Sequence, residues 1–212
     1  MRKAVLTAST ALCGLFAIAT PARAQDAEGE SARRPAAQVA EIVVTAQRRE
    51  ETAQSVPIAI SAISGAELDA RGVTSTLQVV QYIPNMIGMN NTGLGSSNTY
   101  YIRGIGSTES IATFDPPVGT YVDDVYISRQ GANNFSTFDI DRIEVLRGPQ
   151  GTLFGRNTTG GAVSVHMAQP EFDSIGGFLE GGYGTYEAKT LRGSINVPLS
   201  PTFAAKVSAY WQ

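Results

Sequence analysis

The sequence has very little of the chemistry that metal sites and thiol enzymes need. Its 212 residues include one cysteine, Cys13, and one histidine, His166. If Cys13 leaves with an N-terminal signal, the remaining chain can form no disulfide, thiolate metal site or cysteine nucleophile. A lone histidine without cysteines or clustered carboxylates is most often an ordinary strand residue. We therefore predict no metal site and no cofactor.

Charge is absent from residues 4 to 20, which follow the basic pair Arg2 and Lys3. A small-x-small pattern ends at Ala24, so we expect a secretory signal peptide over residues 1–24, cleaved between Ala24 and Gln25. Its apolar stretch is too short and too rich in alanine to favour a permanent membrane span. Cleavage would remove three of the 16 basic residues and none of the 19 acidic ones, leaving a net charge of −6. Such an acidic chain argues against a nucleic-acid partner.

No complete nucleotide-binding or catalytic motif is present. The glycines at 155 and 160 have the spacing of a phosphate-binding loop, but Gly161 and Ala162 stand where lysine and serine or threonine are required. The chain also lacks a nucleophile elbow and a dinucleotide fingerprint. We predict that the protein is not an enzyme.

The first distinctive feature after the expected signal peptide is a short apolar run within a polar stretch. Residues 25–51 are expected to form a disordered leader, interrupted by the β-branched run Glu41–Ala46. An isolated strand of this length is marginal in water. It is therefore either an edge strand of the following domain or a peptide that adds as a strand to the open sheet edge of another protein.

Residues 52–169 have the pattern of a small α+β domain with a mixed sheet, two short helices and long loops. Capping-box patterns at Ser64 and Ser75 predict the helices, which end near Gly72 and at Pro84. Asn85–Asn98 is read as a mobile loop after a brief strand. Strands are expected at Val56–Ile60, Met86–Met89, Tyr100–Ile105, Val118–Val122, Val125–Ile127, Ile143–Leu146 and Ala162–Val165, with Asp123 and Asp124 as the turn residues of a hairpin.

Residues 170–212 have a different residue pattern from the domain before them. Three runs alternate small or polar residues with larger ones, and the last ends in Tyr210 and Trp211. Such hairpin-linked strands are typical of the start of a transmembrane β-barrel. Three strands cannot close, and open edges are not tolerated in lipid, so we expect this barrel to be incomplete in the sequence.

Two arginines stand where a strand meets glycine. Arg103 follows Tyr100–Ile102, and Arg147 lies within Ile143-Glu-Val-Leu-Arg-Gly-Pro-Gln-Gly-Thr-Leu-Phe-Gly155. They are either surface residues or side chains that need a carboxylate, because burying an unpaired charge is costly.

This glycine-rich signature and the Tyr100–Gly104 run resemble the plug domain of TonB-dependent outer-membrane receptors. The β-branched run Glu41–Ala46, which precedes this domain, resembles the TonB box of that family. The resemblance implies that TonB is bound by Glu41, Ile42, Val43, Val44, Thr45 and Ala46. It also implies that Arg103 and Arg147 pair with glutamates on the inner barrel wall, with Glu144 as a local alternative acceptor for one of them.

The resemblance further implies energised uptake of a scarce or bulky substrate, such as a siderophore or another small organic ligand, across the cell outer membrane. The expected partners are the periplasmic domain of TonB, the substrate and, if the barrel is complete, outer-membrane lipid. Loops on a rigid scaffold often carry ligand contacts, so we expect substrate contact at Asn90, Asn91 and Asn98. The alternative is a truncated periplasmic plug fragment that binds TonB without transporting.

Overall fold

The computed structural model describes residues 42–45, 49, 51–91, 94–111 and 113–212. The predicted signal peptide with its cleavage site at Ala24 and Gln25, the rest of the leader up to Ala40, and the box residues Glu41 and Ala46 lie outside this part. The chain divides into two units, 1–38 and 39–212, and the second contains everything described below. Among the residues that the structure describes, no helix is long and apolar enough to cross a membrane.

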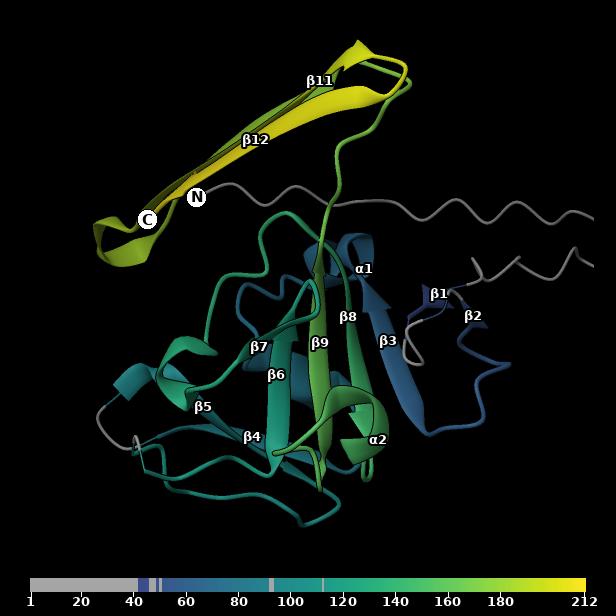
Figure 1. Ribbon diagram of the computed structural model, residues 1–212. Helices are drawn as coiled ribbons and strands as arrows, with labels where there is room; N and C mark the ends of the chain where they lie inside the picture. The colour runs from purple at the N-terminus through teal and green to yellow at the C-terminus, as the bar shows by residue number, and fades with distance from the viewer. Residues whose placement is uncertain (1–41, 46–48, 50, 92–93, 112) are drawn as a thin grey trace, which may run out of the picture. The chain divides into compact units, whose positions relative to one another are not determined.

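A five-stranded mixed sheet forms the centre of the domain (Figure 1). In order across the sheet its strands are β3 (Ile60–Ser64), β8 (Ile140–Arg147), β9 (Gly161–Met167), β6 (Val118–Val122) and β7 (Val125–Ile127). Only the β6–β9 pair is parallel. Strand β8 is buried continuously from Ile143 to Leu146, as expected for a central strand covered on both faces.

Alternation along the strands sorts the apolar side chains onto the two faces of the sheet. Val145 and Val163 belong to one cluster, whereas their neighbours Leu146 and Ala162 belong to another. Successive strand residues point to opposite faces, so each cluster covers one face. The first face packs against helix α1 (Gly65–Ala70) through Leu68. The second face carries Phe154 of the short helix α2 (Gly151–Phe154).

The first predicted helix is confirmed and the second differs. At α1 the Ser64 hydroxyl accepts a hydrogen bond from the amide of Glu67 at 3.3 Å, which is the expected N-cap. The second helix is a 3₁₀ helix, η1 (Gln78–Tyr82), without a side-chain cap. Its Gln78 side chain instead accepts from the amide of Thr74 at 2.7 Å, so the capping box predicted at Ser75 is wrong. Helix α2 was not predicted.

The strand predicted at Met86–Met89 is confirmed, but the described polar residues after it, predicted as a mobile loop, belong to a β-hairpin. Strands β4 (Met86–Asn91) and β5 (Leu94–Ile102) pair antiparallel. The prediction followed the local Asn, Gly and Ser content, but β5 is satisfied from far along the chain. The Asn133 side chain accepts from the amide of Asn98 at 2.7 Å and donates to its carbonyl at 2.8 Å. Tertiary hydrogen bonds thus stabilise a strand that local composition disfavours.

Two smaller predictions have opposite outcomes. The hairpin turn at Asp123 and Asp124 is confirmed, and both residues have positive φ angles, 45° and 66°, as a type I′ turn requires. The strand predicted at Val56–Ile60 is displaced, because β3 begins only at Ile60. Pro57 cannot donate to a sheet ladder, and pairing starts beyond it.

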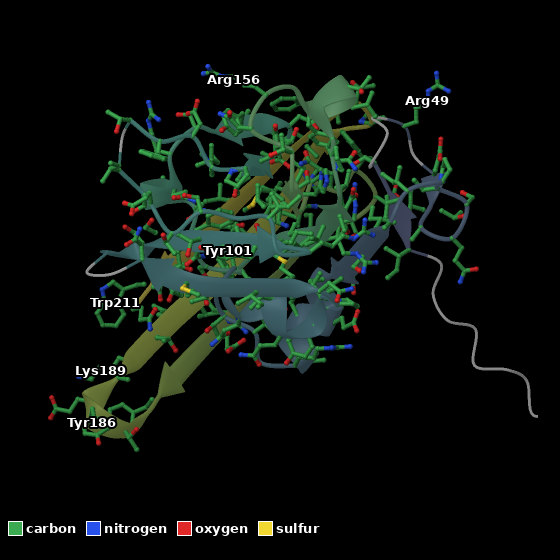
Figure 2. The ribbon with its side chains drawn as sticks, turned by 90° about the horizontal axis from the view of Figure 1, so that it is seen from below. Arg49, Tyr101, Arg156, Tyr186, Lys189 and Trp211 are labelled. Atoms are coloured by element: carbon green, nitrogen blue, oxygen red, sulfur yellow. The ribbon has the colours of Figure 1, made fainter. Side chains whose placement is uncertain are left out.

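A separate antiparallel sheet follows, made of β10 (Gly176–Tyr183), β11 (Lys189–Ser200) and β12 (Phe203–Trp211). Its alternation gives one apolar and one polar face. Ile195 pairs with Val207 on the exposed apolar face. On the other face the Ser194 and Ser208 hydroxyls are 2.9 Å apart. Figure 2 shows Tyr186 and Lys189 at the β10–β11 turn.

Candidate functional site

Residues Ile42–Thr45, the described part of the predicted TonB box, lie on the second face of the central sheet. We call them the box segment. Its strand β1 (Val43–Val44) pairs antiparallel with β2 (Glu51–Thr52). Val44 is fully buried, whereas Val43 is 46% exposed, so alternation sends one side chain into the core and the other outward. The second apolar cluster, into which Val44 inserts, also includes Val56, Tyr121, Leu146, Phe154 and Ala162.

A buried polar cluster holds the end of the box segment. The amide of Thr45 donates to Glu144 Oε1 at 2.8 Å, and its hydroxyl lies 3.3 Å from the same oxygen. Arg142 donates from Nε to Glu144 Oε1 at 2.8 Å and from Nη2 to the Thr45 hydroxyl at 3.1 Å. The Glu144 side chain is only 1% exposed. A buried carboxylate needs such partners, because an unpaired one is strongly destabilising.

His166 completes the cluster, which we call the Glu144 cluster: Thr45, Arg142, Glu144, Ser164 and His166. The His166 Nε2 atom is 3.4 Å from Glu144 Oε1, 3.3 Å from the Thr45 hydroxyl and 3.2 Å from the Ser164 hydroxyl. Burial and the nearby Arg142 charge lower the pKa of His166, outweighing the carboxylates of Glu144, Asp124 and Asp123. The imidazole is therefore neutral at neutral pH.

Arg142 stays charged beside this neutral imidazole. Burial disfavours its charged form, but hydrogen bonds to Glu144 and Asp141 outweigh that effect and raise the pKa of Arg142. Where the structure describes the chain, no three His, Cys, Asp or Glu residues could hold a metal ion together. The cluster is thus a hydrogen-bonded ion pair with a neutral imidazole at its side.

Sequence reasoning treated His166 as an ordinary strand residue and did not find this cluster. A signal was present, because Arg142 and Glu144 on β8, and Ser164 and His166 on β9, are spaced two apart within apolar strands. Such spacing places polar side chains on one face of the sheet. Nothing local indicated that Thr45, 99 residues before Glu144, would join them.

The structure brings Arg103 and Arg147 to the same end of the domain; because they are predicted to pair with barrel glutamates and so hold the plug, we call them the lock arginines. Arg103 has φ of 52° after β5, and its amide donates to the carbonyl of Asn85 at 2.9 Å. Arg147 ends β8, and its Nη1 donates to the carbonyl of Pro84 at 3.5 Å. The Arg103 Nη1 atom lies only 3.4 Å from where a Cβ on Gly148 would be. The Arg103 guanidinium therefore lies beside Gly148, the residue after Arg147, and the Arg147 guanidinium reaches the carbonyl of Pro84.

Neither lock arginine takes part in an ion pair with a described residue. The Arg147 Nε is buried without a hydrogen-bond partner in the described part of the chain. The local alternative, in which Glu144 accepts one of the two, is wrong. Glu144 is bound by Arg142, whose side chain lies on its own side of the sheet at the i−2 position.

The three asparagines predicted to contact substrate differ in accessibility. Asn98 is fully buried, and its Nδ2 donates to the Tyr100 hydroxyl at 2.9 Å. Asn90 donates to the Asn98 side chain at 2.9 Å. Asn91 donates to the carbonyl of Thr108 at 2.7 Å and to the Ser110 hydroxyl at 2.6 Å. Asn98 thus braces the hairpin in this structure and presents no surface to a ligand, whereas substrate contact at Asn90 and Asn91 stays a prediction.

Comparisons with known proteins place this geometry in a family. The model of the TonB-dependent Receptor Plug Domain matches residues 52–162, just over half of the chain. The pesticin receptor of Yersinia pestis is 28% identical over 160 residues, covering 74% of this chain and 23% of that protein. The vitamin B12 transporter BtuB of Vibrio vulnificus is 27% identical, covering 58% of this chain and 20% of its own length. The chain therefore spans about a quarter of these relatives.

Solved structures agree on the fold. The ferric yersiniabactin uptake receptor FyuA from Yersinia pestis superposes with a TM-score of 0.64 at 25% identity, covering 72% of this chain and 24% of that one. The pyoverdine receptor FpvA from Pseudomonas aeruginosa gives a TM-score of 0.64 at 18% identity, covering 79% and 24%. The predicted α+β domain and the antiparallel strands after it are thereby confirmed. The chain belongs to the TonB-dependent receptor plug-domain family.

Proposed function

We propose that this chain is the N-terminal, plug-bearing part of an outer-membrane receptor that takes up a scarce or bulky small organic ligand using energy delivered through TonB. The relatives support this proposal, since their names describe a pesticin receptor, a vitamin B12 transporter and a ferric yersiniabactin uptake receptor. The observation that carries it is the box segment: a short strand bound to the plug by few backbone contacts and placed ahead of the plug in the chain.

The box segment suits exchange between two partners. Among the described residues, strand β1 pairs with the two residues of β2 alone, and so short a hairpin is marginal by itself. Its half-exposed Val43 side already faces outward. Added to an open sheet edge of the TonB periplasmic domain, the segment would gain main-chain hydrogen bonds along its whole length. Glu41 and Ala46 would extend that strand at its two ends.

Arg103 and Arg147 would fasten the plug in its barrel. The support is their position at one end of the domain and the unpartnered, buried Nε of Arg147. A carboxylate from outside the described residues would complete this guanidinium, because a buried donor without a hydrogen-bond partner is costly. Barrel glutamates, as the family resemblance implies, would supply it. The apolar face of β10–β12 would then contact outer-membrane lipid.

Proline substitution tests the role of the box segment. Proline has no amide donor, so Val43→Pro removes a ladder hydrogen bond and should abolish binding to the purified TonB periplasmic domain. Arg49→Pro is the control, since Arg49 lies outside the box, is exposed and points away from the rest of the ribbon (Figure 2). Isothermal titration of both variants measures the affinity. Unchanged affinity in Val43→Pro would contradict strand addition by this segment.

A further inference from the structure

The sheet of β10, β11 and β12 carries a row of polar residues on the face opposite its exposed apolar face. They occupy every second position of β11 and of β12, and each stands across from one on the other strand. We call them the polar row: Arg192, Ser194, Asn196, Lys206, Ser208 and Tyr210. Residues spaced by two share a face of a sheet. Ser194 and Asn196 are buried, whereas Ile195 between them is 53% exposed, so the polar face is the covered one.

Two consecutive plug residues, Phe138 and Asp139, contact the polar row. The Phe138 ring stacks on Tyr210 with the ring centroids 6.1 Å apart. Asp139 Oδ1 is 2.6 Å from Lys206 Nζ, and Asp139 Oδ2 accepts a hydrogen bond from the Ser208 hydroxyl. The φ angle of Asp139 is 58°. This left-handed backbone lets two consecutive side chains reach the same strands, since an extended chain would send them to opposite sides.

Two ion pairs cross from the plug to the sheet, and in each the acid belongs to the plug and the base to the sheet. Arg192 Nη1 is 3.4 Å from Asp69 Oδ1 of α1, but the Asp69 side chain is 63% exposed, so this pair contributes little. The Asp139 and Lys206 side chains are only 12% and 16% exposed. Away from water a charge-assisted hydrogen bond is strong, and loss of one partner is costly. The Asp139–Lys206 pair is therefore the main polar contact.

The apolar face of the sheet buries too little to order these strands by itself. Ile195 and Val207 pair across β11 and β12 on that face, and their side chains are 53% and 66% exposed. Three strands are stable alone only when they bury a hydrophobic face. What stabilises the sheet in this structure must therefore be sought on its polar face.

We propose that Phe138 and Asp139 form a docking surface for the polar row, and that β10–β12 stays ordered only while it is bound there. The partner of this surface is a segment of the same chain, so the inference requires neither TonB nor a ligand. Asp139 directly precedes β8, so docking takes place at the end of that strand opposite Arg147. The plug thus holds the strands that follow it at a point separate from the lock arginines.

Hydrogen exchange of the full chain measures the order of the sheet. Asp139→Asn removes the charge but keeps the shape of the side chain, and asparagine tolerates a left-handed backbone. The exchange rate of the β11 and β12 amides should rise by on the order of tenfold, because the Lys206 ammonium loses its carboxylate. Asp124→Asn is the matched control, since it makes the same change at an exposed turn residue with φ of 66°, and it should leave these rates unchanged.

A double-mutant cycle assigns the effect to the ion pair. Lys206→Met removes the ammonium and should also speed exchange in β11 and β12. The double variant should then exchange no faster than the faster single variant, because both changes remove one interaction. Amides of β8 and β9 report the plug itself and should keep their rates.

Unchanged rates in β11 and β12, additive effects in the double variant, or equal acceleration in β8 and β9 would each overturn the proposal. The proposed function is tested separately by binding to the TonB periplasmic domain. If exchange behaves as expected but that domain does not bind, only the proposed function fails.

Discussion

Strand β8 carries an arginine near each end, Arg142 and Arg147, and the two guanidinium groups have different hydrogen-bond partners. Arg142 pairs with Glu144 on the same strand and contacts Thr45. Arg147, at the glycine end, has a buried Nε without a partner among the described residues. The first arginine pairs with a carboxylate of its own strand, whereas the second reaches only the carbonyl of Pro84 among the described residues. The two ends of one strand thus differ in how far the described residues satisfy an arginine.

Removing the paired arginine should have the largest effect. Arg142→Met leaves the buried Glu144 carboxylate without its guanidinium, which should lower the free energy of unfolding by about 3–5 kcal/mol. Arg147→Met, the matched change, strands no carboxylate and should cost less than ~1 kcal/mol. Urea unfolding of both variants measures the difference. Equal decreases in the free energy of unfolding would mean that pairing with Glu144 does not set Arg142 apart from Arg147.

A smaller effect tests whether the buried Val44 side chain, besides the polar contacts of the Glu144 cluster, holds the box segment on the sheet. Val44→Ala removes two methyl groups from a fully buried site, which should weaken docking of the box segment by about 2 kcal/mol. Val43→Ala alters a side chain that is 46% exposed and should have little effect. The Thr45 amide donates a hydrogen bond to Glu144, so its hydrogen-exchange rate reports the docking of the box segment. This rate should rise ~30-fold in Val44→Ala and stay unchanged in Val43→Ala. Equal exchange in the two variants would show that the polar cluster holds the segment alone.

Much of the fold was predictable because it depends on local period and turn chemistry. The strands Val118–Val122 and Val125–Ile127 and the Asp-Asp turn between them have the predicted bounds. Strands at Met86–Met89 and from Tyr100 were predicted, but the polar first part of β5 was not, because it is satisfied by Asn133, 35 residues beyond Asn98. Where hydrogen-bond partners come from distant sequence, composition indicates a loop although the chain forms a strand.

The candidate site likewise combines features that local sequence predicts with contacts between segments far apart in the chain. The positions of Arg103 and Arg147 at glycine ends of strands were visible in the sequence, since each motif contains its own turn. The contact between Thr45 and Glu144 was not, because it joins segments 99 residues apart. The sequence also offered Glu144 as an alternative acceptor for one of the lock arginines, and that alternative is wrong, because Glu144 pairs with Arg142. Residues spaced by two share a face, which favours Arg142, whereas Arg147 is three positions away and on the other face.

The smallest effect, a pH dependence, tests whether His166 belongs to the paired end of β8. Burial and Arg142 lower the pKa of His166 below its ordinary value, so the folded domain favours the neutral imidazole. The unfolded chain binds a proton first as the pH falls, and stability that is complete above the ordinary histidine pKa is lost as the pH drops towards the folded pKa. The free energy of unfolding should therefore decrease from about pH 7.5 to about pH 5.5.

His166→Gln should remove this decrease, because glutamine keeps a polar side chain beside the Thr45 and Ser164 hydroxyls but does not titrate. Arg147→Met should keep it, since that arginine lies at the other end of β8 and does not act on the imidazole. Urea midpoints measured across this pH range for the three chains give the comparison. If the slope survives in His166→Gln, the acid sensitivity arises from groups elsewhere, and the imidazole is not coupled to the ion pair that holds the box segment.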